Sequence, residues 1–178
     1  MDEEISMKHA LMAALVFSIA LPTALMAQAK TDFSGTWTFD EAKSDPAPAR
    51  AGGGGGGGGG GRGGGRMGGA PATAMTIKQT PAELSMDRTT AQGAQTVIYK
   101  LYGTDSQNTI GMGPATSKAV WDGARLVVTT TQTVQGRGGE ITINSKDIYS
   151  VQGNVLTIET TRTTPAGEQT RKLIYTKS

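Results

Sequence analysis

The stretch that decides the fold is SKAVWDGARLVVTTTQT, residues 117–133. Apolar and polar side chains alternate on both sides of Asp122-Gly123, which is the period of a strand buried on one face. An Asp-Gly pair between two such runs favours a tight hairpin, because glycine tolerates a positive φ. We therefore expect strands over 117–121 and 125–133, joined at Trp121-Asp122-Gly123-Ala124.

The same alternation extends in both directions from this hairpin, and turns rich in Gly, Pro and Asn separate the runs. No segment has a convincing helical period. The further predicted strands are 35–40, 74–79, 83–89, 95–101, 140–151, 155–162 and 168–177. Together they indicate an all-β fold, an antiparallel up-and-down meander of eight to ten strands.

A meander of this size has to hide its apolar face, and either a sandwich or a closed barrel does so. Closure is favoured, since successive hairpins place neighbouring strands side by side and a closed barrel has no free edge. The interior of such a barrel holds side chains or one small ligand. We expect any binding site to lie inside it.

The first 29 residues have the order of a secretory signal peptide, with a basic start, an apolar run and a small-residue end. These parts are Lys8-His9, Ala10 to Ala20 and Ala27-Gln28-Ala29. We expect translation to begin at Met7, cleavage after Ala27 or Ala29, and a periplasmic or secreted protein. The apolar run is too short for a membrane span and the chain has no cysteine for a lipid anchor. No stable membrane insertion is therefore expected after cleavage.

Residues 46–72 are predicted to be a disordered Pro- and Gly-rich insertion in a single domain of residues 30–178. Gly52 to Gly61 is an unbroken glycine run, which has nothing to bury against the entropy of ordering the backbone. Arg62 and Arg66 are too few, and lack aromatic neighbours, for an RNA-binding segment. The full chain carries a net charge of only +2, and no nucleic-acid partner is expected.

The composition excludes much catalytic chemistry. The one histidine, His9, lies in the signal segment, and cysteine is absent. A Ser-His-Asp or Cys-His site and a His- or Cys-ligated zinc site are thereby excluded, and no catalytic residue, metal or cofactor is predicted. Hydrolysis by two paired carboxylates remains an alternative, with Asp40, Glu41, Asp45, Asp122, Asp147 and Glu159 as the available acids. Asp147 falls on the apolar phase of its strand, and if buried it needs Arg162, Arg171 or a hydroxyl as partner.

Three segments carry a resemblance to a known family. FSGTWTFDEAKSD at residues 33–45, with its Gly-x-Trp element, WDGARLVV at 121–128 and KLIY at 172–175 resemble small exported lipocalin-like proteins of bacteria, which are calycin-type β-barrels. The resemblance implies that Trp37 lies across one end of the barrel and packs against a basic residue of a late strand. Arg171 or Lys172 is the expected partner.

The resulting hypothesis is a non-enzymatic protein of the cell envelope that binds or carries a small, partly apolar ligand. Trp37 is expected mainly to pack the barrel end, and Trp121 either to cap the core or to line the barrel mouth. The candidate ligand contacts are Trp37, Met86, Tyr99, Trp121, Tyr149 and Tyr175. The alternatives are a structural or protein-interaction module with a solid core, and a carboxylate-based hydrolase.

Overall fold

A computed structural model describes residues 30–46, 71–91, 93–111, 113–136, 139–164 and 167–178. The predicted signal peptide and nearly all of the predicted Gly-rich insertion lie outside these residues. The described chain forms ten strands and one short 3-10 helix, η1 (Glu41–Lys43). The strands are β1 (Gly35–Phe39), β2 (Ala74–Gln79), β3 (Glu83–Thr90), β4 (Gly93–Lys100), β5 (Asp105–Ile110), β6 (Gly113–Asp122), β7 (Arg125–Gly136), β8 (Gly139–Gln152), β9 (Val155–Thr164) and β10 (Gly167–Lys177).

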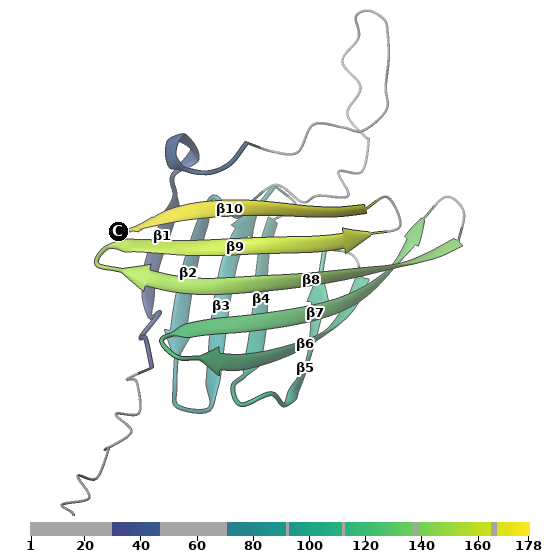
Figure 1. Ribbon diagram of the computed structural model, residues 1–178, viewed down its shortest axis with the longest axis horizontal. Helices are drawn as coiled ribbons and strands as arrows, with labels where there is room; N and C mark the ends of the chain where they lie inside the picture. Colours follow the sequence, from purple (N-terminus) through teal and green to yellow (C-terminus); the bar gives the residue numbers. More distant parts are fainter. Residues whose placement is uncertain (1–29, 47–70, 92, 112, 137–138, 165–166) are drawn as a thin grey trace, which may run out of the picture.

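The ten strands form one antiparallel sheet in the order β4-β3-β2-β1-β10-β9-β8-β7-β6-β5. Every pair except β1 with β10 is consecutive along the chain, so the sheet is a meander whose first and last strands meet. Figure 1 shows β7 to β10 crossing in front of β2 to β4 at a steep angle, as in a coiled sheet that curls back on itself. The predicted all-β meander is confirmed, and it forms a nearly closed barrel.

The hairpin predicted at residues 117–133 joins β6 to β7. Asp122 pairs with Arg125 at its end, and Trp121 pairs with Leu126. Gly123 has a φ of 62°, a conformation that a residue with a Cβ adopts only at a steric cost. The local turn chemistry therefore sets the register of the whole β6–β7 pair.

β5 was not among the predicted strands, and β6 begins four residues earlier than predicted. The β5 sequence is DSQNTI, in which only Ile110 is apolar, so it has no period-two apolar signal. Its inward positions are occupied instead by Ser106 and Asn108. These residues serve the one place where the barrel is not closed by a strand ladder.

That place is a seam between the free edges of β4 and β5, which contact each other without pairing. Side chains bridge the two edges. The Asn108 Oδ1 accepts from Ile98 N at 2.8 Å, and its Nδ2 donates to Ile98 O at 2.9 Å. Ser106 Oγ accepts from Lys100 N, and Gln95 Nε2 donates to Thr109 O. The backbone groups at the seam thus find side-chain partners, and the barrel is nearly closed.

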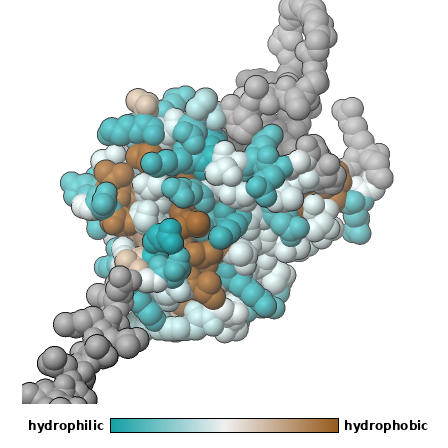
Figure 2. Space-filling view, in the orientation of Figure 1, coloured by the Kyte–Doolittle hydropathy of each residue, from teal (hydrophilic) through white to brown (hydrophobic). Residues whose placement is uncertain are grey.

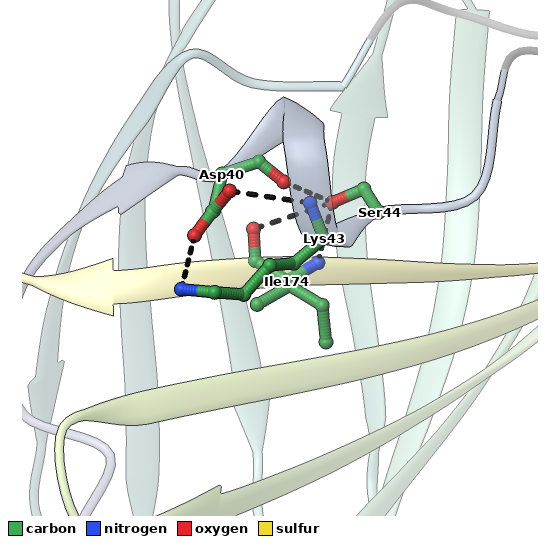
Figure 3. Close-up of polar contacts among 4 residues, drawn as sticks. All are labelled: Asp40, Lys43, Ser44 and Ile174. Carbon is green, nitrogen blue, oxygen red and sulfur yellow. Dashed lines mark hydrogen bonds and ion pairs between the residues drawn. The ribbon is translucent and has the colours of Figure 1, made fainter.

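Residues 40–45 follow β1 and form a polar strap, which covers the edge of β10 that the short β1 leaves free. Asp40 caps η1, its carboxylate accepting from Lys43 N at 3.2 Å and from Lys43 Nζ at 2.7 Å. Ser44 Oγ donates to Asp40 O and accepts from Ile174 N (Figure 3). The strap explains why Ile174 is only 6% exposed although it lies on the outer face.

The apolar half of the barrel is filled with side chains. Phe33, Trp37, Leu126, Val128 and Leu156 are fully buried there. The rest of this cluster comprises Ala72, Met75, Ile77, Leu84, Met86, Val97, Tyr99, Leu101, Ala119, Tyr149, Ile158 and Tyr175. The outer face is mainly hydrophilic, with scattered apolar patches (Figure 2). Val120, Val127 and Ile148 are register partners across β6, β7 and β8, and Val120 is 44% exposed. No helix of the described residues is long and apolar enough to cross a membrane.

Candidate functional site

Away from the filled half, the inward faces of several strands turn polar and enclose a small chamber. Its volume is about 60 Å³, and the lining comes from β3, β4, β5, β7, β8 and β9. The lining residues are Arg88, Tyr99, Ile110, Thr130, Gln132, Ile143, Ser145, Asp147 and Arg162. Two guanidinium groups and one carboxylate therefore face the same enclosed space.

Arg88 is the most informative residue of the chamber. It continues the inward phase of β3 after Leu84 and Met86, so the strand itself directs its side chain into the barrel. Its Nη2 donates to Gln95 Oε1 at 2.7 Å. Its Nε is buried and has no hydrogen-bond partner among the described residues. A buried donor without an acceptor is costly. Arg88 lines the chamber and also a more open hollow beside it, so an acceptor for Nε could be supplied by a molecule bound in either space.

Asp147 lies in the inward phase of β8, two positions before Tyr149, as the sequence pattern indicated. Burial is the main cause that raises the pKa of the Asp147 carboxyl above its usual value. A hydrogen bond from the Thr160 hydroxyl and the charges of Arg162 and Arg88 oppose this shift. The sequence predicted that Asp147, if buried, needs a charged or hydroxyl partner. The Thr160 hydroxyl and the charge of Arg162 both serve Asp147 in this way.

Two tyrosines close the wall between the chamber and the core. Tyr99 is 2% exposed and Tyr149 is 4% exposed. Burial raises the pKa of the Tyr99 hydroxyl, and burial also raises the pKa of Tyr149 well above its ordinary value. Both phenols therefore stay neutral in the physiological range and act as hydrogen-bonding groups, with a bond between the two side chains.

The structure separates the six predicted ligand contacts. Tyr99 lines the chamber, and Tyr149 adjoins Tyr99 and the Asp147 charge. Met86 and Tyr175 are each 1% exposed within the filled core, where they serve as packing. Burial raises the pKa of Tyr175 to about 12.

Trp37 is fully buried, and its Nε1 donates to Phe33 O at 2.9 Å. The cation over its ring is Lys177, whose Nζ lies 5.4 Å from the ring centroid. The cation at this position is therefore neither Arg171 nor Lys172, the two predicted partners, and Arg171 Nε instead donates to Asp45 O at 3.0 Å. Trp37 pairs with Lys177 in the β1–β10 ladder, so the register places the last lysine against it.

Trp121 belongs to the closed end and is part of its cap. It stacks on Phe33, and Lys30 Nζ lies 5.7 Å from its ring centroid. The same Lys30 ammonium donates to Tyr102 Oη at 2.7 Å. Tyr102 has a φ of 77°, which is strained for a tyrosine. The Lys30–Tyr102 hydrogen bond thus joins the loop that contains Tyr102 to the segment that precedes β1, at this end of the barrel.

The acids considered for hydrolysis are not gathered in one cleft. Asp147 faces the chamber, whereas Asp122 forms an exposed ion pair with Arg125 and Asp40 forms one with Lys43. Asp45 accepts from the backbone of β10, and Glu41 and Glu159 are exposed. The pairing of carboxylates that this alternative requires is not found among the described residues. They also contain no group of three or more side chains suited to holding a metal ion.

Arg88 and Gln132 were not among the predicted site residues, and Arg162 was predicted only as a partner of Asp147. The signal for Arg88 is visible in the sequence, because it stands on the apolar phase of the run from Leu84 through Met86. A charged residue in that phase has to face the barrel interior. A more open hollow of about 210 Å³ over β2, β3 and β4 shares Arg88 with the chamber.

The fold and the chamber define a nearly closed antiparallel β-barrel with a polar interior site. No protein-family model matches the chain, and no curated protein does. Among solved structures, a secretory abundant heat soluble protein from Ramazzottius varieornatus is similar, with 19% identity and a TM-score of 0.44 over 59% of this chain and 70% of that one. The fatty-acid-binding protein of Manduca sexta is similar with 22% identity and a TM-score of 0.40 over 58% of this chain and 71% of that one.

Proposed function

We propose that this protein is a non-enzymatic binding protein that holds a small, partly apolar molecule by an anionic group inside its barrel. The observation that carries the proposal is the buried Nε of Arg88, a residue that lines the chamber, because this Nε has no hydrogen-bond partner among the described residues. A carboxylate or sulfonate oxygen would supply the missing acceptor. Guanidinium groups match such planar or forked anions well.

The charge of the chamber supports an anionic ligand. Arg88 and Arg162 line it against the single carboxylate of Asp147, so the lining carries an excess of one positive charge when all three are ionised. Arg88, Asp147 and Arg162 are half-buried, and in such a partly shielded site this charge interacts more strongly with a ligand than it would on the surface. An anion therefore gains attraction there that a neutral molecule of equal size does not.

The rest of the lining suits a short apolar portion. Ile110 and Ile143 face the chamber, together with the ring of Tyr99. The volume of about 60 Å³ favours a compact ligand, because the neighbouring half of the barrel is already filled by Trp37 and the core around it. A long chain would have to displace packed side chains, which costs several kcal/mol.

Calorimetry with a charged and a neutral probe of nearly equal shape tests the proposal. Methanesulfonate should bind to the full chain and dimethyl sulfone should not. Arg88→Gln should weaken methanesulfonate binding by about tenfold or more, since one buried charge-assisted hydrogen bond is lost. Arg125→Gln is the matched control, because Arg125 pairs with Asp122 at an exposed turn. Equal binding of both probes, or no effect of Arg88→Gln, would contradict the proposal.

A second candidate is a structural or interaction module, and the tightly filled apolar half favours it. Native mass spectrometry of freshly purified protein separates the two, since a carrier retains a small molecule and a solid module does not. We further propose that the protein works in the cell envelope after removal of residues 1–29. The mass of the mature chain tests that proposal.

A further inference from the structure

Among the described residues, Asp147 is the only acid that lines the chamber, and its carboxylate lies in the positive field of Arg88 and Arg162 that an anionic ligand would need. Arg88 enters from β3 and Arg162 from β9, while Asp147 enters from β8 between them and the tyrosine pair. A second negative charge in about 60 Å³ would face this carboxylate at close range. Two carboxylates that share one site do not both stay ionised at little cost.

We propose that Asp147 makes binding proton-linked: the chamber takes up an organic monoanion together with one proton, which Asp147 receives from solvent. This inference rests on the proposed function, because it concerns the same site. The Asp147 carboxylate is protonated when the anion binds, so the chamber does not hold two negative charges. The arginines then attract the ligand, and the neutral Asp147 carboxyl group lines the chamber as a hydrogen-bonding group.

The groups around Asp147 make it the one that takes the proton. Arg88 on β3 and Arg162 on β9 are cations, and Thr160 beside it on β9 donates a hydrogen bond. Tyr99 on β4 and Tyr149 on β8 are phenols whose pKa values burial raises, so they do not ionise near neutrality. Thr130 and Gln132 on β7, Ser145 on β8 and the isoleucines do not titrate. Among the described lining residues, Asp147 is the one acid, and its surroundings shift its carboxyl towards the protonated form.

The direction of the pH effect follows from linkage. The carboxyl pKa of Asp147 lies above its ordinary value in the free protein, because of burial. A bound anion raises it further, since it offsets the arginine charges. Between these two values, binding takes up as much as one proton, and the affinity falls up to about tenfold for each pH unit as the pH rises. Below the lower value Asp147 is already neutral, and the affinity no longer changes.

Methanesulfonate is the appropriate probe, because it remains ionised throughout and any pH dependence then belongs to the protein. We expect its affinity for the full chain to fall as the pH rises through the raised pKa of the Asp147 carboxyl. Calorimetry in buffers of different ionisation enthalpy should show uptake of up to one proton per anion, and this measurement needs no variant.

Asp147→Asn should bind methanesulfonate more tightly near neutral pH, by about tenfold or more, and without pH dependence. Asp105→Asn is the control, because Asp105 is exposed beside Lys118 on the outer face and should leave the slope unchanged. Anion-selective binding with no pH dependence and no proton uptake overturns this inference while the proposed function stands. If neither the native chain nor Asp147→Asn binds methanesulfonate, both this inference and the proposed function are overturned.

Discussion

Phe33 stacks on Trp121 with ring centroids 5.9 Å apart and ring planes inclined by 21°. Tyr149 meets the same phenylalanine edge-on at 6.2 Å. Phe33 precedes the first strand, yet it is fully buried because its backbone amide donates to Gln79 Oε1 and its carbonyl accepts from Trp37. The segment before β1 is therefore an integral part of the barrel end.

The two tryptophans should respond differently to the same substitution. Trp37→Phe removes the donor to Phe33 O and leaves a buried carbonyl unsatisfied, with a loss of about 2–4 kcal/mol. Trp121→Phe removes an Nε1 that has no partner among the described residues, so it should cost within about 1 kcal/mol. Urea unfolding of both variants measures the difference, and equal losses would contradict the assigned hydrogen bonding.

Asn108 should hold the β4–β5 seam. Asn108→Ala removes both bonds to Ile98, with an expected loss of about 1–3 kcal/mol and faster amide exchange at Ile98. The matched control is Gln107→Ala, one position away on the exposed outer face, with a change of about 0.5 kcal/mol or less. Unchanged exchange at Ile98 in the first variant would mean that the seam is held by other contacts.

Ser117 and Thr130 share a buried hydroxyl pair at 2.8 Å. Ser117→Ala or Thr130→Val alone leaves the other hydroxyl without this partner, so each should cost about 1–2 kcal/mol. The double variant should cost less than the two single losses together, with a coupling of about 1 kcal/mol. A thermodynamic cycle from denaturant unfolding checks this, and strict additivity would show that the pair is not coupled.

Asp147 should lower stability at neutral pH. Its pKa is raised in the folded chain, so folding favours its protonated form, and stability is lost as the pH rises from its unfolded pKa, near 3.8, through its folded pKa. Asp147→Asn should therefore exceed the native chain in free energy of unfolding at pH 7, and the gain should shrink as the pH falls towards 4. Unfolding curves from pH 3.5 to 8 measure this, with Asp105→Asn as the comparison at an exposed position. A constant difference across that range would argue against a raised pKa.

The sequence was most informative where one local pattern decides the structure. The Asp122-Gly123 turn and the alternation beside it predict β6 and β7, because turn chemistry and side-chain period agree. β5 was not predicted because its inward residues Ser106 and Asn108 are polar and bridge the seam. No local sequence pattern shows which two strand edges will lie opposite each other. The partner of Trp37 depends on the register of β1 against β10, which the intervening chain does not encode locally.

The chamber was predictable only in part. Asp147 was predicted to need a charged or hydroxyl partner because it stands in the apolar phase of its strand. Arg88 also stands in the apolar phase of its strand, but it was not predicted as a site residue. That it shares one cavity with Asp147 and Arg162 is a consequence of the curvature of the sheet, which brings β3 opposite β8 and β9. Curvature of this kind does not follow from the pattern of any single strand.

The pairing of the first strand with the last has a consequence for how the protein is made. Thr38 and Ser178 share a hydrogen bond across 140 positions of sequence. β10 has to leave the ribosome before β1 can pair with it, so the barrel cannot close while the strands between them are being made. Until then the edges of β1 and β9 that β10 covers stay unpaired, and an unpaired strand edge can pair with another chain.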